Sequence, residues 1–409
     1  MNNLLSRAVS FAALWASSAT LAASLFIQLN FGDIEPRFVR QFIETAPDIV
    51  RGVDAGIWAE FILLVLIMPL SLALTLHLIF APSKRPSLYS ISLSVVLASM
   101  ALFFYNPYLI DDTSGMSESQ TGQVLNPIGS STKPTANVIH IFFESLSGSL
   151  GLGGESGDPL EELEDSLRGN ASVGELDWPA ELSPTTINGI GSSLCGWKEV
   201  PKGFNDRDSS NYLASQRSCV SDILANFGYD SSFFQSASGS FQNKQHFLEN
   251  KSFEVYEKQT WQDIGNVETN ISWGQSVHDG RLFDHARALL GQKLAAGEPY
   301  YLAGLSLDTH YPYFPSSSCL GQGDDPTAYL AYACSAAVVG NFIRWAQENT
   351  TKPTLILIQG DHPNKNLDSA STGVYFASLC TAEFTTPPAF PGATYEIPEY
   401  LLEAASECN

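Results

Sequence analysis

Basic residues are scarce in this sequence. Its 409 residues include 21 Lys and Arg against 43 Asp and Glu, which gives a formal net charge of −22 at pH 7. A protein that binds nucleic acid needs Lys and Arg to neutralise the phosphate backbone. We therefore exclude nucleic acid as a partner.

Cysteine is missing from the N-terminal part of the chain, and no two cysteines have the C-x-x-C spacing of zinc or redox motifs. An even number of cysteines confined to one region indicates disulfides formed in an oxidising compartment. Pairing between neighbours in the sequence is the simplest prediction, with buried free thiols as the alternative. The six cysteines are Cys195, Cys219, Cys319, Cys334, Cys380 and Cys408.

Charges are rare in three apolar stretches, at residues 4–31, 57–80 and 88–109. Each stretch is long enough to cross the hydrocarbon core of a bilayer as a helix, and the first is too long for the core of a signal peptide. We therefore predict a membrane anchor of three transmembrane helices over residues 1–110, with the lipid bilayer as a partner.

Lys84 and Arg85 lie in the short loop between the second and third apolar stretches. The positive-inside rule places this loop in the cytoplasm, so the chain after the third helix lies outside. All six cysteines fall on that outer side, which agrees with disulfide formation. We predict a multi-pass protein of the inner or plasma membrane, with a linker at 111–136 and a periplasmic or extracellular domain at 137–409.

Short apolar segments and helical patterns follow one another from residue 137 onward. The apolar segments lack polar alternation, as is typical of strands that are buried on both faces. We predict an α/β domain with a mostly parallel sheet between helices, and an acidic surface loop over 148–175. The predicted strands are 138–143, 232–235, 300–307 and 354–358, and the predicted helices include 221–227, 280–294 and 329–348.

Residues 183–196 predict the start of a helix. Ser183 is a suitable N-cap and Pro184 suits the first helical position, which places Thr185 and Thr186 in the first turn. Free N–H groups and the helix dipole favour an anion there, so a threonine hydroxyl could attack a bound phosphate. The alternative is that these hydroxyls only cap the helix.

Polar residues with metal or phosphate chemistry follow three of the predicted strands. They are Glu144, the segment 308–310 (DTH) and the pair Asp361 and His362. Ligands bind beyond the carboxyl ends of the strands in open α/β sheets, so we expect these residues to lie together. With a threonine at a helix start, they supply the oxygen ligands, imidazole and hydroxyl nucleophile of a metal-assisted phosphoryl transferase.

Six short motifs follow one another along the outer domain. They are NVIHIFFESL at 137–146, SPTTINGIGSSLCG at 183–196, CVSDILANFGYDSSFF at 219–234, SGSFQNKQHF at 238–247, DTHYP at 308–312 and GDH at 360–362. The sequence resembles the phosphoglycerol transferase I and lipoteichoic acid synthase group of the alkaline phosphatase and sulfatase superfamily, in which such motifs have the same order. The T-I-x-G and C-x-x-D-I-L patterns make it more similar to phosphoglycerol transferase I.

The resemblance implies an alkaline phosphatase-like (sulfatase-like) fold and a divalent metal, usually manganese in this group, with zinc also compatible. It implies that Glu144, Asp361 and His362 are metal ligands, and that Thr186 is both a metal ligand and the nucleophile. The implied donor is phosphatidylglycerol, whose glycerophosphate group passes through Thr186 to an envelope glycan or polymer. The implied substrate-binding residues are His310, Lys244 and Asn366.

Three other functions stay open. The same site would serve a phosphoethanolamine transferase or a phosphodiesterase, whereas a sulfatase needs Cys or Ser at the position of Thr186. The third is a non-catalytic envelope-binding homologue, which the short, Pro-rich segment 373–409 favours because it predicts an abridged C-terminal part of the fold. We predict that His140 is a core histidine and that His278 is an ordinary polar residue.

Overall fold

The computed structural model describes most of the chain from residue 133 onward, and all of these residues belong to the compact unit Val124–Asn409. No helix among them has the length and apolar character needed to span a bilayer. The three predicted transmembrane stretches, Ser183 and Asn366 lie outside the described residues. The described ranges are 133–150, 158–167, 171–182, 184–198, 218–239, 244–257, 260, 269–270, 276–311, 313–320, 327–364, 367, 371–386 and 388–409.

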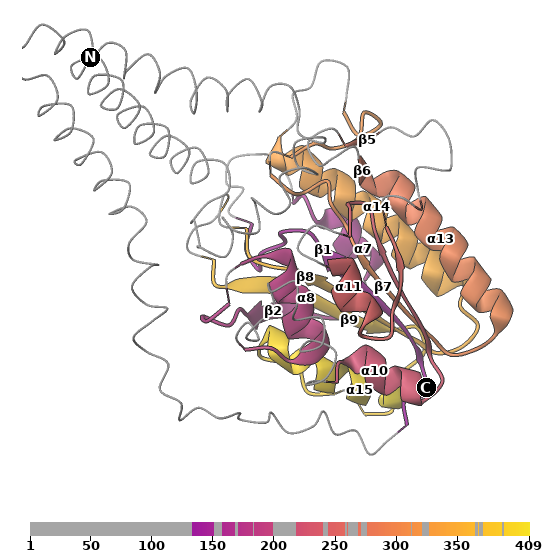
Figure 1. The fold of residues 1–409 in the computed structure, drawn as a ribbon. Coiled ribbons are helices and arrows are strands. Elements are labelled where there is room, and N and C mark those ends of the chain that lie inside the picture. The colour runs from indigo at the N-terminus through magenta and orange to yellow at the C-terminus, as the bar shows by residue number, and fades with distance from the viewer. Residues whose placement is uncertain are drawn as a thin grey trace, which may run out of the picture. The chain divides into compact units, whose positions relative to one another are not determined.

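A seven-stranded, mostly parallel sheet lies at the centre of the described part of the chain (Figure 1). Its strand order is β2-β9-β8-β1-β7-β3-β4, and β9 is antiparallel to both of its neighbours. The predicted α/β fold with a mostly parallel sheet is therefore confirmed. The strands are β1 (Asn137–Phe143), β2 (Ser172–Asp177), β3 (Asp230–Gln235), β4 (Glu254–Tyr256), β7 (Tyr300–Leu305), β8 (Thr354–Gly360) and β9 (Gly373–Cys380), with β5 (Thr269–Asn270) and β6 (Ser276–Val277) as a separate pair.

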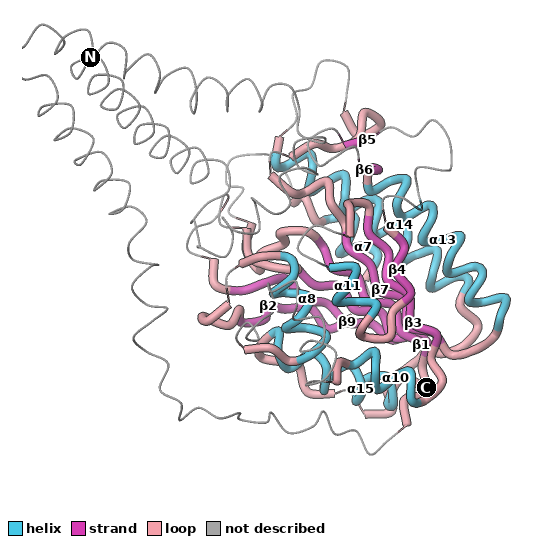
Figure 2. The backbone as a smooth tube through the Cα atoms, viewed as in Figure 1, coloured by secondary structure: helices cyan, strands magenta, loops and turns pink. Residues whose placement is uncertain are grey.

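Helices cover both faces of the sheet, as predicted (Figure 2). The side chains of β1 point alternately to two hydrophobic cores, as the two-residue period of a strand requires. Val138 and Phe142 pack with α8, α10 and α15, whereas Ile139, Ile141 and Phe143 pack with α7, α13 and α14. The helices are α7 (Glu161–Ser166), α8 (Thr186–Cys195), α10 (Val220–Asn226), α11 (Lys244–Glu249), α13 (Asp279–Ala296), α14 (Ala328–Asn349) and α15 (Ile397–Glu407), preceded by the 3₁₀ turn η5 (Thr394–Glu396).

All six cysteines form disulfides between sequence neighbours, so this prediction is confirmed. The bond Cys195–Cys219 joins the last residue of α8 to the residue before α10. The bond Cys380–Cys408 joins the end of β9 to the end of α15. The third bond is Cys319–Cys334.

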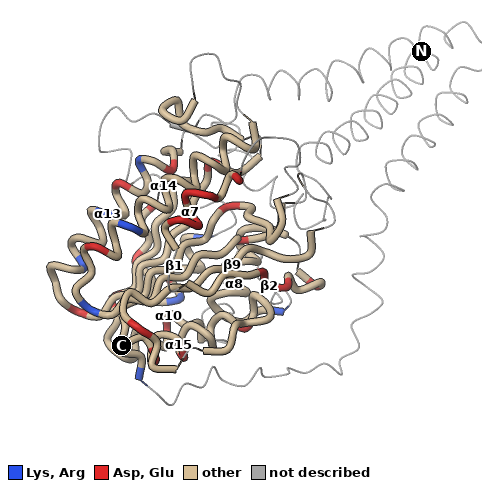
Figure 3. Tube along the Cα trace, turned by 180° about the vertical axis from the view of Figure 1, so that it is seen from behind, with Lys and Arg blue, Asp and Glu red and all other residues tan. Residues whose placement is uncertain are grey.

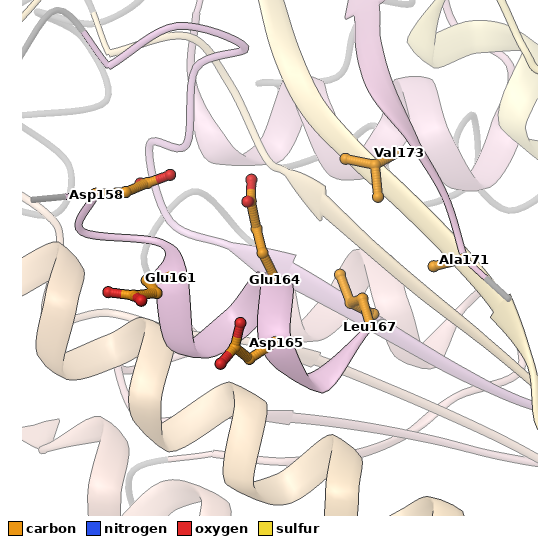
Figure 4. A pocket seen from close by; sticks show the side chains of 7 residues that line it. All are labelled: Asp158, Glu161, Glu164, Asp165, Leu167, Ala171 and Val173. Carbon is orange, nitrogen blue, oxygen red and sulfur yellow. The ribbon is translucent and has the colours of Figure 1, made fainter. Parts of the chain in front are cut away.

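The predicted acidic surface loop over 148–175 is wrong, because this segment contains α7 and the start of β2. Leu160, Leu163 and Leu167 recur at helical spacing and are buried, whereas the three glutamates between them stay exposed on α7 (Figure 3). This leaves a cavity of about 600 Å³ beside α7 and β2 (Figure 4). Its lining residues are Asp158, Glu161, Glu164, Asp165, Leu167, Ala171 and Val173.

Two predicted boundaries also differ from the structure. Pro184 is not the first helical residue, because Thr185 has an extended backbone (φ −132°, ψ 149°) and is the N-cap of α8. Strand β7 ends at Leu305 rather than at 307, since the N–H group of Leu307 donates to the Asp279 carboxylate at 2.7 Å. The segment 373–409, predicted to be abridged, still contributes β9 and α15.

Candidate active site

The carboxyl ends of β1 and β8 lie side by side and carry the predicted metal ligands. Phe143 pairs with Gly360 at the end of this parallel pair, so Glu144 and Asp361 leave the sheet at the same edge. Glu144, Asp361 and His362 each offer a ligand atom within 4.8 Å of the other two. The expectation that these residues lie together is met by the geometry.

Helix α8 brings Thr186 to the same place. The Thr186 Oγ1 atom lies 3.5 Å from Glu144 Oε2, and the side chain is buried. The approach depends on Gly189, one turn further along α8, because a Cβ atom there would lie 1.6 Å from the carbonyl oxygen of Asp361. Direct contact between the helix and the Asp361 backbone therefore sets the position of the threonine.

Gly189→Ala is expected to lower the free energy of unfolding by about 1–3 kcal/mol, because the new methyl group overlaps the Asp361 backbone. The matched control is Gly291→Ala in α13, where nothing lies within 4 Å of the added Cβ and alanine should stabilise the helix by about 0.5–1 kcal/mol. Denaturant unfolding of both variants checks the prediction. Equal stability of the two variants would contradict the close approach.

The turn after β1 is held by hydrogen bonds from side chains of other elements. Ser306 Oγ accepts from the Glu144 N–H group at 2.9 Å, and Thr309 Oγ1 donates to the Glu144 carbonyl at 2.6 Å. The Tyr332 hydroxyl on α14 donates to the carbonyl of Ser145 at 2.6 Å. Ser145 itself has a φ of 55°, in the left-handed region that non-glycine residues seldom adopt. These contacts fix the backbone that presents Glu144.

One carboxylate oxygen of Asp361 is available for a cation. Oδ1 accepts from the N–H groups of Ser145 at 2.7 Å and His362 at 2.8 Å. Oδ2 is buried without a hydrogen bond of normal length, although Thr186 is near enough to lower the pKa of this carboxyl group. A buried carboxylate oxygen without a hydrogen bond is costly unless a cation binds it.

The imidazole of His362 faces the two carboxylates. Its Nδ1 atom lies 3.1 Å from the carbonyl oxygen of Pro363, which fixes Nδ1 as the protonated nitrogen when the ring is neutral. Its Nε2 atom lies 3.4 Å from Glu144 Oε1 and 3.7 Å from Asp361 Oδ2. A backbone carbonyl that orients one ring nitrogen is the usual support of a metal-binding histidine.

The charges of the cluster favour a divalent cation. Burial and the charge of Glu144 raise the pKa of Asp361, which the charge of His362 opposes. Burial alone would lower the pKa of His362, but the charges of Asp361 and Glu144 raise it to about 9. Two buried carboxylates therefore need positive charge beside them, and their oxygens with one imidazole suit a divalent ion such as manganese or zinc.

Two of the predicted substrate-binding residues lie near the cluster. Lys244 is the first residue of α11 and is buried; burial lowers the pKa of its amine to about 8, while the charges of Glu144 and Asp361 raise it. His310 is half-buried after β7, and burial lowers the pKa of its imidazole while the charge of Glu144 raises it. A lysine and a histidine within the field of these carboxylates can bind the oxygens of a phosphate.

The amide side chain that the structure describes beside this cluster is Asn364, and the sequence analysis missed it. Its N–H group donates to Ser147 Oγ at 2.7 Å. Its Nδ2 atom donates to the hydroxyls of Tyr332 at 2.9 Å and Tyr313 at 3.3 Å. Asn364 thus ties the loop after His362 to α14 and to the loop after β7.

His278 is not an ordinary polar residue, as predicted, because it is buried with its Nδ1 atom 2.9 Å from Asp308 Oδ1. The N–H group of Asp279 donates to the Asp308 carboxylate, and the N–H groups of Leu307 and Asp308 donate to the Asp279 carboxylate. Burial and the charge of Asp308 raise the pKa of Asp279, against a hydrogen bond from Ser335. This interlock pins the loop that carries His310 to the start of α13.

His140 is a core histidine, as predicted. It is buried between the Tyr301 hydroxyl, 3.0 Å from Nδ1, and Gln359 Oε1, 3.0 Å from Nε2. Burial lowers the pKa of its imidazole to about 4, although the hydrogen bond with Gln359 raises it. The ring is therefore neutral at neutral pH and supports the sheet beneath the site.

The Sulfatase family model matches residues 136–371, which is more than half of the chain. Phosphoglycerol transferase I of Xanthomonas axonopodis pv. citri (strain 306) is 32% identical over 194 residues, which cover 44% of this chain and 27% of that protein. The chain thus spans less than a third of the length of the curated relatives that it matches.

Two solved structures have a similar fold. The lipoteichoic acid synthase LtaP from Listeria monocytogenes has a TM-score of 0.52 at 15% identity, with 66% of this chain and 72% of that chain covered. The integral membrane protein lipooligosaccharide phosphoethanolamine transferase A (EptA) from Neisseria meningitidis has a TM-score of 0.52 at 12% identity, with 91% and 77% covered. At these identities the likeness is one of fold.

Proposed function

Because the chain belongs to the sulfatase family, we propose that it is a metal-dependent phosphoglycerol transferase. It moves a glycerophosphate group from phosphatidylglycerol, by way of Thr186, to a hydroxyl of an envelope glycan or polymer. The observation that carries the proposal is the buried Thr186 hydroxyl, 3.5 Å from Glu144 in a cluster of two carboxylates and an imidazole. The similarity to phosphoglycerol transferase I of Xanthomonas supports this head group over phosphoethanolamine.

Glu144, Asp361 and His362 hold the cation, manganese in this proposal with zinc as the alternative, and Thr186 is the fourth ligand. A divalent cation supplies two things here, because it lowers the pKa of the threonine hydroxyl and offsets charge on the phosphoryl oxygens. The start of α8 presents its free N–H groups beside Thr186, where they favour an anion.

Two displacements complete the reaction. Thr186 Oγ1 attacks the phosphorus atom, the bond to the diacylglycerol oxygen breaks, and that oxygen takes up a proton. The acceptor hydroxyl then attacks the same phosphorus atom, loses its proton and releases Thr186. Lys244 and Asn366 bind the phosphate oxygens, and His310 binds the phosphate or carries the proton in each step.

The location is part of the proposal. We place the catalytic domain in the periplasm or outside the cell, anchored by the three apolar stretches of residues 1–110 in the membrane that contains the donor lipid. Three disulfides within the described residues support an oxidising compartment.

Turnover of phosphatidylglycerol with a labelled head group tests the function. The full chain, purified in detergent, should release diacylglycerol with manganese and not with a chelator. Phosphatidylethanolamine, assayed in parallel, should be a much poorer donor. Preferential use of phosphatidylethanolamine would reassign the head group, and bound metal without turnover of either lipid would indicate a non-catalytic homologue.

The charge of Lys244 should give donor binding a pH dependence. Its pKa is lowered to about 8 in the folded protein, so the positive charge is lost as the pH rises through about 8. We expect the KM for phosphatidylglycerol to rise above that pH with less change in kcat. Lys244→Arg keeps its charge over the same range, so its KM should stay level. Identical pH profiles of the two proteins would refute a charged lysine at the donor phosphate.

A further inference from the structure

An exposed aromatic ring follows directly on His310. Tyr311 is 36% exposed, and the other large apolar side chains of comparable exposure among the described residues are Val173 and Phe390, at 50% and 41%. Its carbonyl oxygen lies 2.6 Å from Nδ1 of His310, which links the tyrosine backbone to the imidazole. The ring therefore lies at the edge of the proposed active site.

The ring of Tyr311 is supported from within the protein. It packs edge-to-face on Tyr313, with ring centroids 5.6 Å apart and an interplanar angle of 88°. Tyr313 is buried, and its hydroxyl accepts from Asn364, which also donates to Tyr332. Tyr332 in turn donates to the carbonyl of Ser145, next to Glu144. Tyr311 is thus held at a set position relative to the metal-binding turn.

We propose that the Tyr311 ring is a platform on which a sugar ring of the acceptor packs, so that an acceptor hydroxyl is presented to Thr186. This inference rests on the proposed transferase function and names the acceptor class as carbohydrate. The C–H groups on one face of a pyranose ring complement the negative face of an aromatic ring. A single rigid ring offers this contact at low cost in conformational entropy, because Tyr has only two side-chain torsions.

A lipid surface fits this ring less well. Insertion into a bilayer needs a contiguous apolar face, and the residues that follow Tyr311 include Ser316, Ser317 and Ser318. The two other exposed apolar residues belong to the outer edge of the sheet, where Phe390 covers Gly174 of β2. Within the described residues, Tyr311 has no exposed large apolar neighbour besides Tyr313 beneath it.

The test separates acceptor binding from donor turnover. The probe is a β-linked gluco-oligosaccharide, and its Kd for the full chain is measured by calorimetry with manganese present. Tyr311→Ala should raise the Kd about tenfold, whereas Tyr311→Phe should stay within about twofold of wild type, because the ring and not the hydroxyl makes the contact. Phe390→Ala is the matched control, since Phe390 also packs edge-to-face, 5.4 Å from Phe376, and should leave the Kd unchanged.

Donor turnover is read out in the same proteins without acceptor. Diacylglycerol release should be the same in Tyr311→Ala and wild type, while glycerophosphate transfer to the oligosaccharide falls about tenfold. Unchanged oligosaccharide binding in Tyr311→Ala would overturn the platform. So would a loss of donor turnover or of binding to phosphatidylglycerol vesicles, which would assign the ring to the lipid. If wild type binds the oligosaccharide through Tyr311 but releases no diacylglycerol, the function proposed above fails and the platform stands.

Discussion

Thr186→Ala is expected to lower diacylglycerol release by at least about 10⁴-fold, the scale of removing a nucleophile from an enzyme that uses covalent catalysis. The hydroxyl is the group of α8 that reaches Glu144, at 3.5 Å. The free energy of unfolding should change by less than about 1 kcal/mol, because the hydroxyl makes one long hydrogen bond and the helix start is retained. Loss of turnover with an intact fold separates catalysis from structure.

Thr185→Ala is the matched control for the nucleophile. Thr185 is the neighbouring hydroxyl and the N-cap of α8, but its side chain makes no capping hydrogen bond. We expect this variant to keep most of the turnover and stability of wild type. Labelled glycerophosphate should accumulate on wild type in the absence of acceptor and not on Thr186→Ala. Turnover that survives in Thr186→Ala and is lost in Thr185→Ala would move the nucleophile by one residue.

Asp361→Asn is expected to weaken manganese binding by about 100-fold or more and to lower turnover at least as much, because it removes one of two anionic ligands. The metal-free protein should nevertheless gain stability on the order of 1 kcal/mol. The pKa of Asp361 is raised in the metal-free fold by burial and by Glu144, so the folded state holds this proton more tightly than the unfolded chain. The ionised carboxylate at neutral pH therefore destabilises the metal-free fold, and asparagine removes that charge.

Unfolding by denaturant with manganese and with a chelator measures both effects. Wild type should be stabilised by manganese in proportion to ligand occupancy, and the variant should show little of this stabilisation. The control is Asp284→Asn, an exposed carboxylate on α13 whose two ion pairs are 3.6 Å long and which should alter neither quantity. A variant that binds manganese as tightly as wild type would remove Asp361 from the ligand set.

The ligand cluster could be predicted because it depends on few non-local facts. The strands predicted at 138–143 and 354–358 are neighbours in the sheet, and a carboxylate after each strand must then reach the same edge. The disulfides were predictable for a similar reason, because each one closes a short loop. In both cases, order along the chain and proximity in the fold coincide.

The supporting contacts could not be predicted in this way. The hydroxyls of Ser306, Thr309 and Tyr332 act on Glu144 and Ser145 from more than 150 positions away in the sequence, and nothing in their local pattern marks them. His278 was misjudged because its partner, Asp308, follows it by 30 residues. Helix α7 was missed because its six residues carry mostly charge, and its leucines gain a partner surface only when α14 packs on them.

The bond between Cys195 and Cys219 also bears on how this part of the molecule can change. It anchors the end of the nucleophile helix to the start of α10 whatever lies between them. A protease cut within that interval would leave two fragments that separate on a denaturing gel only after treatment with a thiol reductant. For the same reason, insertions between these cysteines can accumulate during evolution, or carry an affinity tag, without releasing Thr186 from its place over the carboxylates.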